Sequence, residues 1–117
     1  MFKGAEVLDI NTIKDEIIEA LLPLNPSKII LFGSHAYGTP TEDSDIDIFL
    51  LKDNLKLDEL REYELQARKY IRKIIFEYHV GFDIVSAPTA LINEREDYFY
   101  KVDVLQNGKV WYEQEAS

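Results

Sequence analysis

The sequence predicts an α/β fold, with a small mixed sheet and helices on one side. Three apolar runs have the length and composition of β-strands, and polar turns separate them. Two longer segments repeat their apolar residues at helical spacing instead. The strands are expected at Ile29–Phe32, Ile46–Leu51 and Phe82–Ser86, and the helices at Thr12–Leu22 and Leu57–His79.

The composition is typical of a folded globular domain. The chain has 117 residues, of which 46% are hydrophobic, so we expect a single domain over residues 1–117. No apolar stretch has the length of a signal sequence or a membrane span, and there are no cysteines. We therefore expect a cytoplasmic protein with no membrane contact and no disulfide framework.

The net charge of −9 limits the kinds of partner. Proteins that bind nucleic acid by neutralising phosphates usually present a basic surface, which makes nucleic acid an unlikely direct partner here. A small acceptor or another protein fits this charge better. The segment Leu57–His79 is the most basic region; a solvated helix face explains such a charge run, and a docking surface for an acidic partner is the alternative.

Capping and helix-breaking residues mark the ends of the first predicted helix, and two further elements are expected near the C-terminus. Asn11 or Thr12 can cap the first helix, and Pro23 follows its end. A further helix is expected at about Asn93–Gln106, and residues 109–112 either form a short edge strand or pack back on the sheet.

Two carboxylates stand at the start of the second predicted strand. Asp45 and Asp47 are two residues apart, so in a strand they project from the same face, ~6.6 Å apart. A simple turn explains Ser44-Asp45, but it does not require an aspartate between Ile46 and Ile48, inside an apolar run. Paired carboxylates are typical ligands of divalent cations, so this pattern indicates a metal site.

A Gly-Ser turn ends the first predicted strand. After Gly33, the residues Ser34 to Tyr37 are expected to form a short helical turn. The free N–H groups at such a turn favour anions, so phosphate can bind there. Alternatively, Ser34 is a plain N-cap residue.

This ordered set resembles the signature of the DNA polymerase β-type nucleotidyltransferase superfamily. Gly33-Ser34, Gly38 and Ser44-Asp45-Ile46-Asp47 carry the resemblance, which extends over about residues 28–86. The sequence motif GSHAYG…DSDID is most similar to that of the minimal nucleotidyltransferases, which are often encoded beside a HEPN-domain partner. The resemblance implies the polymerase β-type nucleotidyltransferase fold and a metal-dependent enzyme.

The resemblance also implies roles for individual residues. Asp45 and Asp47 would bind two Mg²⁺ ions, for which Mn²⁺ can substitute, and Asp83 on the third strand would be the third catalytic carboxylate. Gly33 and Ser34 would hold the phosphates of ATP or another nucleoside triphosphate. The implied reaction moves a nucleoside monophosphate to an acceptor hydroxyl and releases pyrophosphate.

The acceptor is expected to lie outside this chain. Few residues remain to build an acceptor domain, so another protein or a second copy, in a homo-oligomer, would complete the site. The resemblance implies an antitoxin that adenylylates a tyrosine of a HEPN toxin. The alternatives are a non-catalytic antitoxin that acts by binding alone, and a small-molecule nucleotidyltransferase of the antibiotic-modifying kind.

Overall fold

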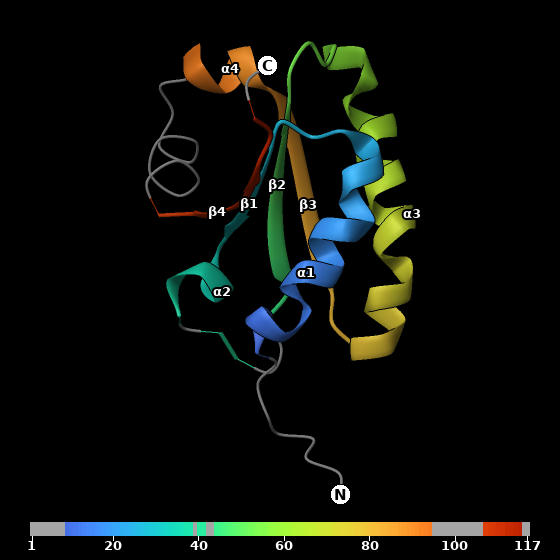
Figure 1. The fold of residues 1–117 in the computed structure, drawn as a ribbon, viewed down its shortest axis with the longest axis vertical. Helices are drawn as coiled ribbons and strands as arrows, with labels where there is room; N and C mark the ends of the chain where they lie inside the picture. Colours follow the sequence, from blue (N-terminus) through green and yellow to red (C-terminus); the bar gives the residue numbers. More distant parts are fainter. Residues whose placement is uncertain (1–8, 39, 42–43, 95–106, 116–117) are drawn as a thin grey trace, which may run out of the picture.

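A four-stranded sheet carries two long helices on one face in the computed structural model, which describes residues 9–38, 40–41, 44–94 and 107–115 (Figure 1). The predicted α/β class is confirmed, with helices flanking a mixed sheet. The strands are β1 (Lys28–Phe32), β2 (Ile46–Lys52), β3 (Phe82–Pro88) and β4 (Lys109–Glu113). The helices are α1 (Ile10–Leu21), α2 (Ser34–Tyr37), α3 (Leu60–Tyr78) and α4 (Thr89–Glu94), with 3₁₀ turns at Leu22–Leu24 and Leu57–Glu59.

The strands follow the order β3-β2-β1-β4 across the sheet. β1 is antiparallel to both β2 and β4, whereas β2 and β3 are parallel and α3 connects them. This topology brings the end of β1 and the beginnings of β2 and β3 to the same end of the sheet, the lower end in Figure 1. The sheet therefore gathers three chain segments that are far apart in sequence.

The main core lies between the sheet and the two long helices. Alternate residues of β2, namely Ile46, Ile48 and Leu50, are fully buried in it. The helices contribute apolar residues at helical spacing: Ile13, Ile17 and Leu21 from α1, and Tyr63, Ala67, Ile71 and Ile74 from α3. Neither helix, nor any other in the described part of the chain, is long and apolar enough to cross a membrane.

A smaller apolar cluster lies on the opposite face of the sheet. It contains Ile30 and Phe32 of β1, Phe49 and Leu51 of β2, and Ala87 of β3. The rings of Phe32 and Phe49 meet edge to face, with centroids 6.3 Å apart. Because strand side chains alternate, Asp47 projects from β2 on this same face.

The limits of several elements differ from the sequence predictions. The cap of α1 is Asp9, whose carboxylate accepts a hydrogen bond from the N–H of Asn11, so the predicted caps Asn11 and Thr12 are wrong. The predicted helix at 93–106 lies outside the described residues beyond Glu94. Residues 109–113 do form an edge strand, β4, which pairs with β1. Asp9, Asn11 and Thr12 are all of types that commonly cap a helix, which is why the sequence alone did not identify the cap of α1.

Candidate active site

The strand register places Asp47 in the middle of the sheet. Asp47 pairs with Phe32 of β1 on one side and with Asp83 of β3 on the other. Residues paired in a parallel ladder project from the same face, so the Asp47 and Asp83 carboxylates are neighbours. Asp45 lies just before β2 and is exposed. The three predicted carboxylates therefore lie at one end of the sheet.

Two glycines lie directly against these carboxylates. A Cβ atom at Gly33 would overlap the Asp47 carboxylate and lie 2.9 Å from its Cγ. A Cβ atom at Gly81 would likewise overlap the Asp45 carboxylate and lie 3.1 Å from its Cγ. The chain thus places backbone, with no side chain, beside each of the two acids of the Asp-x-Asp pair.

The predicted phosphate turn follows the end of β1. Gly33 is the N-cap of α2, with φ of 75° and ψ of −161°, a conformation open to glycine and strained for other residues. Ser34 is the first residue of the helix, so the interpretation of Ser34 as a plain N-cap is wrong. Because Gly33 touches Asp47, the turn and the acidic pair are parts of one site.

His35 lies behind the turn and is buried, with 4% of its surface exposed. Its Nε2 is 3.5 Å from the carbonyl oxygen of Ser44, the residue before Asp45. Its Nδ1 is buried and has no hydrogen-bond partner among the described residues. His35 therefore connects α2 to the segment that leads into β2.

Burial and crowding of negative charge act together on Asp47. Partial burial raises the pKa of this carboxyl above its ordinary value of 3.8, and the negative charges of Asp83 and Asp45 raise it further. The nearby His35 lowers the pKa of Asp47 in part. A carboxylate held in this way gains most from a cation that neutralises it.

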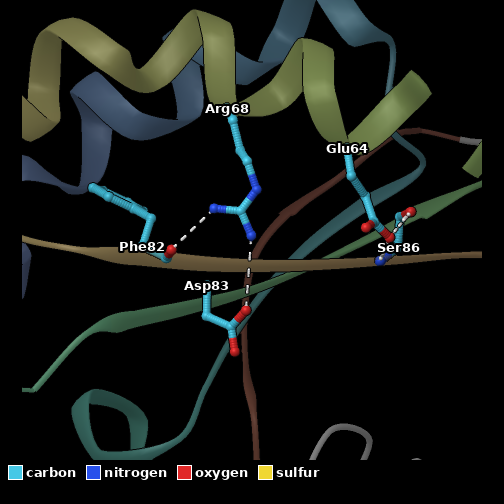
Figure 2. A network of polar contacts seen from close by, with 5 residues as sticks. All are labelled: Glu64, Arg68, Phe82, Asp83 and Ser86. Atoms are coloured by element: carbon cyan, nitrogen blue, oxygen red, sulfur yellow. Dashed lines mark hydrogen bonds and ion pairs between the residues drawn. The ribbon is translucent and has the colours of Figure 1, made fainter. Parts of the chain in front are cut away.

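Arg68 of α3 extends across the edge strand β3 to the third acid (Figure 2). Its Nη1 donates a hydrogen bond of 3.3 Å to the carbonyl of Phe82, and its Nη2 lies 3.9 Å from Oδ1 of Asp83. One turn earlier, Oε2 of Glu64 accepts hydrogen bonds from the N–H and the hydroxyl of Ser86, at 3.0 and 2.7 Å. α3 therefore covers polar groups of an exposed strand edge and at the same time supplies a cation to the site.

The donor set suits a hard divalent cation in its chemistry. Asp45, Asp47 and Asp83 offer carboxylate oxygens, the ligands that Mg²⁺ and Mn²⁺ prefer. Within the described ranges, however, no group of three or more His, Cys, Asp or Glu side chains is arranged to hold a metal ion. The orientation of Asp83 accounts for this in part, since one of its oxygens faces Arg68. Asp45 and Asp47 therefore offer suitable ligand chemistry for a cation, and so does Asp83, which the structure pairs with Arg68.

Three residues of this site were missed in the sequence. Gly81 and His35 gave no usable signal, because a glycine after a helix and a histidine in a short turn have many ordinary explanations. Arg68 lay within a run of basic residues whose members the sequence does not distinguish. Only the three-dimensional contacts set these three residues apart.

Comparison with known proteins gives one family match and several relatives. The family described as "Nucleotidyltransferase domain" matches residues 11–111. A candidate protein adenylyltransferase of Methanocaldococcus jannaschii is 34% identical over 85 residues, which cover 73% of this chain and 77% of the relative.

Solved structures give similar results. A crystal structure described as a toxin-antitoxin with AMP-PNP is 27% identical and has a TM-score of 0.55, covering 87% of this chain and 74% of that one. A crystal structure of a candidate nucleotidyltransferase from Sulfolobus solfataricus has a TM-score of 0.62 at 18% identity, covering 91% of this chain and 81% of that one. The second likeness supports the fold alone.

Proposed function

The chain belongs to the nucleotidyltransferase domain family and is a nucleotidyltransferase, and we propose that it transfers AMP from ATP to a hydroxyl group of a protein toxin. One observation carries this proposal. Asp45, Asp47 and Asp83 lie at the same end of the sheet, where Gly33 brings a helical turn against Asp47. Acidic ligands and a turn suited to phosphate are the two components that this transfer requires.

In the proposed reaction, the acceptor oxygen forms a bond to the α-phosphorus as the bond from that phosphorus to the β-phosphate oxygen breaks. Pyrophosphate leaves with the electron pair of the broken bond, and the hydroxyl proton passes to Asp83 or to solvent. Gly33 and Ser34 hold the departing phosphates. Divalent cations such as Mg²⁺, held by Asp45, Asp47 and Asp83, would neutralise charge on the phosphates and polarise them. The chain's own contribution is mainly positioning and electrostatic stabilisation.

The toxin as acceptor is supported by the relatives and by the size of the described fold. A candidate protein adenylyltransferase and a toxin-antitoxin are among the similar proteins. The described elements build the sheet, its two cores and the site, and we propose that another protein presents the acceptor. We propose a tyrosine of a HEPN-domain toxin as this acceptor, and one nucleotidyltransferase domain over residues 1–117.

A second candidate function is neutralisation of the toxin by binding alone. The observation in its favour is that Asp83 faces Arg68, so the three carboxylates are not assembled around a common point. The two functions differ in whether the toxin is modified.

The test is transfer of label from α-³²P-ATP, with Mg²⁺, to the protein encoded by the adjacent gene. We expect label on that protein with the wild type and none with Asp45→Asn. Asp15→Asn, at an exposed position on α1, serves as the matched control and should transfer normally. A partner that is neutralised but never labelled would support binding alone and reject the transfer.

A further inference from the structure

The solvent-facing side of α3 carries an unusual row of residues, which we call the α3 ridge: Arg61, Leu65, Lys69, Arg72 and Phe76. Their spacing of four, four, three and four residues keeps them on one side of the helix, and all five are exposed. Leu65 has 51% and Phe76 has 71% of its surface exposed. The core-facing side of α3 is formed by other residues, so neither apolar side chain is needed to pack the fold.

The ridge is also an island of positive charge. α3 contains five basic and three acidic residues, whereas the rest of the chain contains eight basic and nineteen acidic ones. None of the acidic residues belongs to the ridge, and Glu64 is turned toward Ser86 of β3. Two apolar anchors, three helical turns apart, are thus separated and flanked by cations.

We propose that the α3 ridge binds an acidic amphipathic helix of a protein partner. Apolar residues of the partner helix would bury Leu65 and Phe76, and its carboxylates would pair with Arg61, Lys69 and Arg72. The charge of the ridge, opposite to that of the remaining chain, is what favours an acidic occupant.

Other occupants fit the ridge less well. In a two-fold pairing of α3 with a second copy, Leu65 would meet Phe76, but Lys69 would meet Arg72 of the other copy, and like charges repel. A phosphate backbone offers nothing apolar to cover the two anchors. A membrane surface that is anionic would repel the strongly acidic remainder of the chain.

This inference deepens the proposed function, on which it rests, by assigning the surface that holds the protein partner. α3 is the helix whose Arg68 reaches Asp83 across the edge of β3 (Figure 2). A partner held on the ridge would therefore lie on the outer side of the helix that reaches the third carboxylate. Docking and transfer use different residues, so they can be separated by mutation.

The probe is a fluorescein-labelled helical peptide of about twenty residues, with leucines on one face and glutamates on the other, titrated by anisotropy. The control peptide has every glutamate replaced by lysine. We expect the acidic peptide to bind and the basic one not to bind, with binding that weakens as salt increases. Leu65→Ser, Phe76→Ser and the double variant Arg61→Glu/Arg72→Glu should each weaken binding by roughly tenfold or more.

Two variants serve as matched controls. Val110→Ser removes an equally exposed apolar residue, with 53% of its surface accessible, and Lys109→Glu reverses an exposed charge, both on β4. We expect both to bind the acidic peptide as the wild type does. All variants should keep the thermal shift given by Mn²⁺-ATP, because the ridge is not part of the active site.

The proposal is overturned if the ridge variants bind the acidic peptide like the β4 variants, or if no binding is seen. It is also overturned if tRNA or phosphatidylserine vesicles bind the ridge more tightly than the peptide, or if ridge variants abolish self-association instead. Failure of the proposed function has a different signature: the peptide binds through the ridge, yet no label is transferred in an Asp45-dependent manner.

Discussion

Gly33 lies directly against the carboxylate of Asp47, with no room for a side chain between them. A Cβ atom at residue 33 would lie 2.9 Å from Cγ of Asp47, and the backbone there has a φ of 75°. The contact joins the turn after β1 to the acid near the start of β2, an inner strand of the sheet. It explains why residue 33 is a glycine.

The first prediction concerns this contact. Gly33→Ala should lower the free energy of unfolding by about 2 kcal/mol or more, because alanine is strained at this φ and overlaps the Asp47 carboxylate. If overlap with the Asp47 carboxylate causes part of this loss, Gly33→Ala should lower the free energy of unfolding by less in an Asp47→Ala background. Urea unfolding of the single and double variants measures the difference.

Gly38→Ala is the matched control for the same experiment. Gly38 has a similar φ of 79°, but a Cβ atom there meets nothing within 4 Å. Its effect should add to that of Asp47→Ala with no coupling. Equal coupling for both glycines would reject a specific contact between Gly33 and Asp47.

The second prediction concerns Gly81 and Asp45. Gly81→Ala introduces no φ strain, but its methyl group overlaps the Asp45 carboxylate and should displace it. We expect a loss of stability below about 1 kcal/mol, because the carboxylate is the movable end of an exposed side chain. The thermal shift given by Mn²⁺-ATP should nevertheless fall clearly. A full shift in the variant would show that Asp45 does not need its position beside Gly81.

The third prediction concerns Arg68 as a competitor for Asp83. Removal of the guanidinium by Arg68→Gln should raise the affinity for Mn²⁺ alone by about two- to fivefold, because an exposed ion pair of this kind contributes at most about 1 kcal/mol. Electron paramagnetic resonance of free Mn²⁺ measures this directly. Arg72→Gln, one turn further along α3, is the control and should change little. Weaker Mn²⁺ binding in the Arg68 variant would mean that Arg68 orients Asp83 for the ion instead.

Much of this arrangement follows from local sequence patterns. The three predicted strands are present as short apolar runs, and the two long helices are present because their apolar residues repeat at a period of 3.6. Residues of both kinds of segment form the main core. The alternation within Ile46–Lys52 was enough to place Ile46, Ile48 and Leu50 on one face of the sheet and Asp47 on the other. These patterns lie within single segments of the chain, so they can be read from the sequence alone.

The contacts that could not be predicted from the sequence depend on how distant strands pair and how helices pack on them. Gly81 meets Asp45 only because β3 pairs with β2 from Ile46 and Phe82 onward. Arg68 reaches Asp83 because α3 packs along the edge strand β3. The helical periodicity of α3 does not predict which strand the helix packs against. The pairing of residues 109–113 with β1 was equally open, since a five-residue strand does not specify its neighbour.

The last prediction tests the electrostatic burden on Asp47. Its pKa is raised by burial and by Asp83 and Asp45, so the ionised carboxylate destabilises the fold at pH 7. Two carboxylates ~6.6 Å apart repel by about 2.5 kcal/mol at an effective dielectric of ~20, and solvent reduces this to ~1 kcal/mol. In EDTA at pH 7, Asp47→Asn should therefore raise the melting temperature by about 4 °C.

The sign of the pH dependence follows from the same shift. Because the pKa of Asp47 is higher in the folded protein, protonation of this carboxyl stabilises the fold. This stabilisation is fully present below pH 3.8 and is lost as the pH rises through the pKa of Asp47 in the folded protein. The advantage of Asp47→Asn should therefore shrink as the pH falls toward 3.8, where the wild type binds the proton itself. Asp15→Asn, at an exposed position on α1, is the control and should show no such trend.

The same variant separates a cation ligand from a structural carboxylate. Mn²⁺-ATP should stabilise the wild type by about 2.7 kcal/mol at a hundred times its Kd, and Asp47→Asn should lose most of this stabilisation. A structural carboxylate that accepts hydrogen bonds in the core would behave in the opposite way, because its loss lowers the melting temperature and leaves the ligand shift intact. Thermal melts of both proteins, in EDTA and in Mn²⁺-ATP, distinguish the two cases. A lower melting temperature in EDTA together with an unchanged ligand shift would rule out Asp47 as a ligand of the cation.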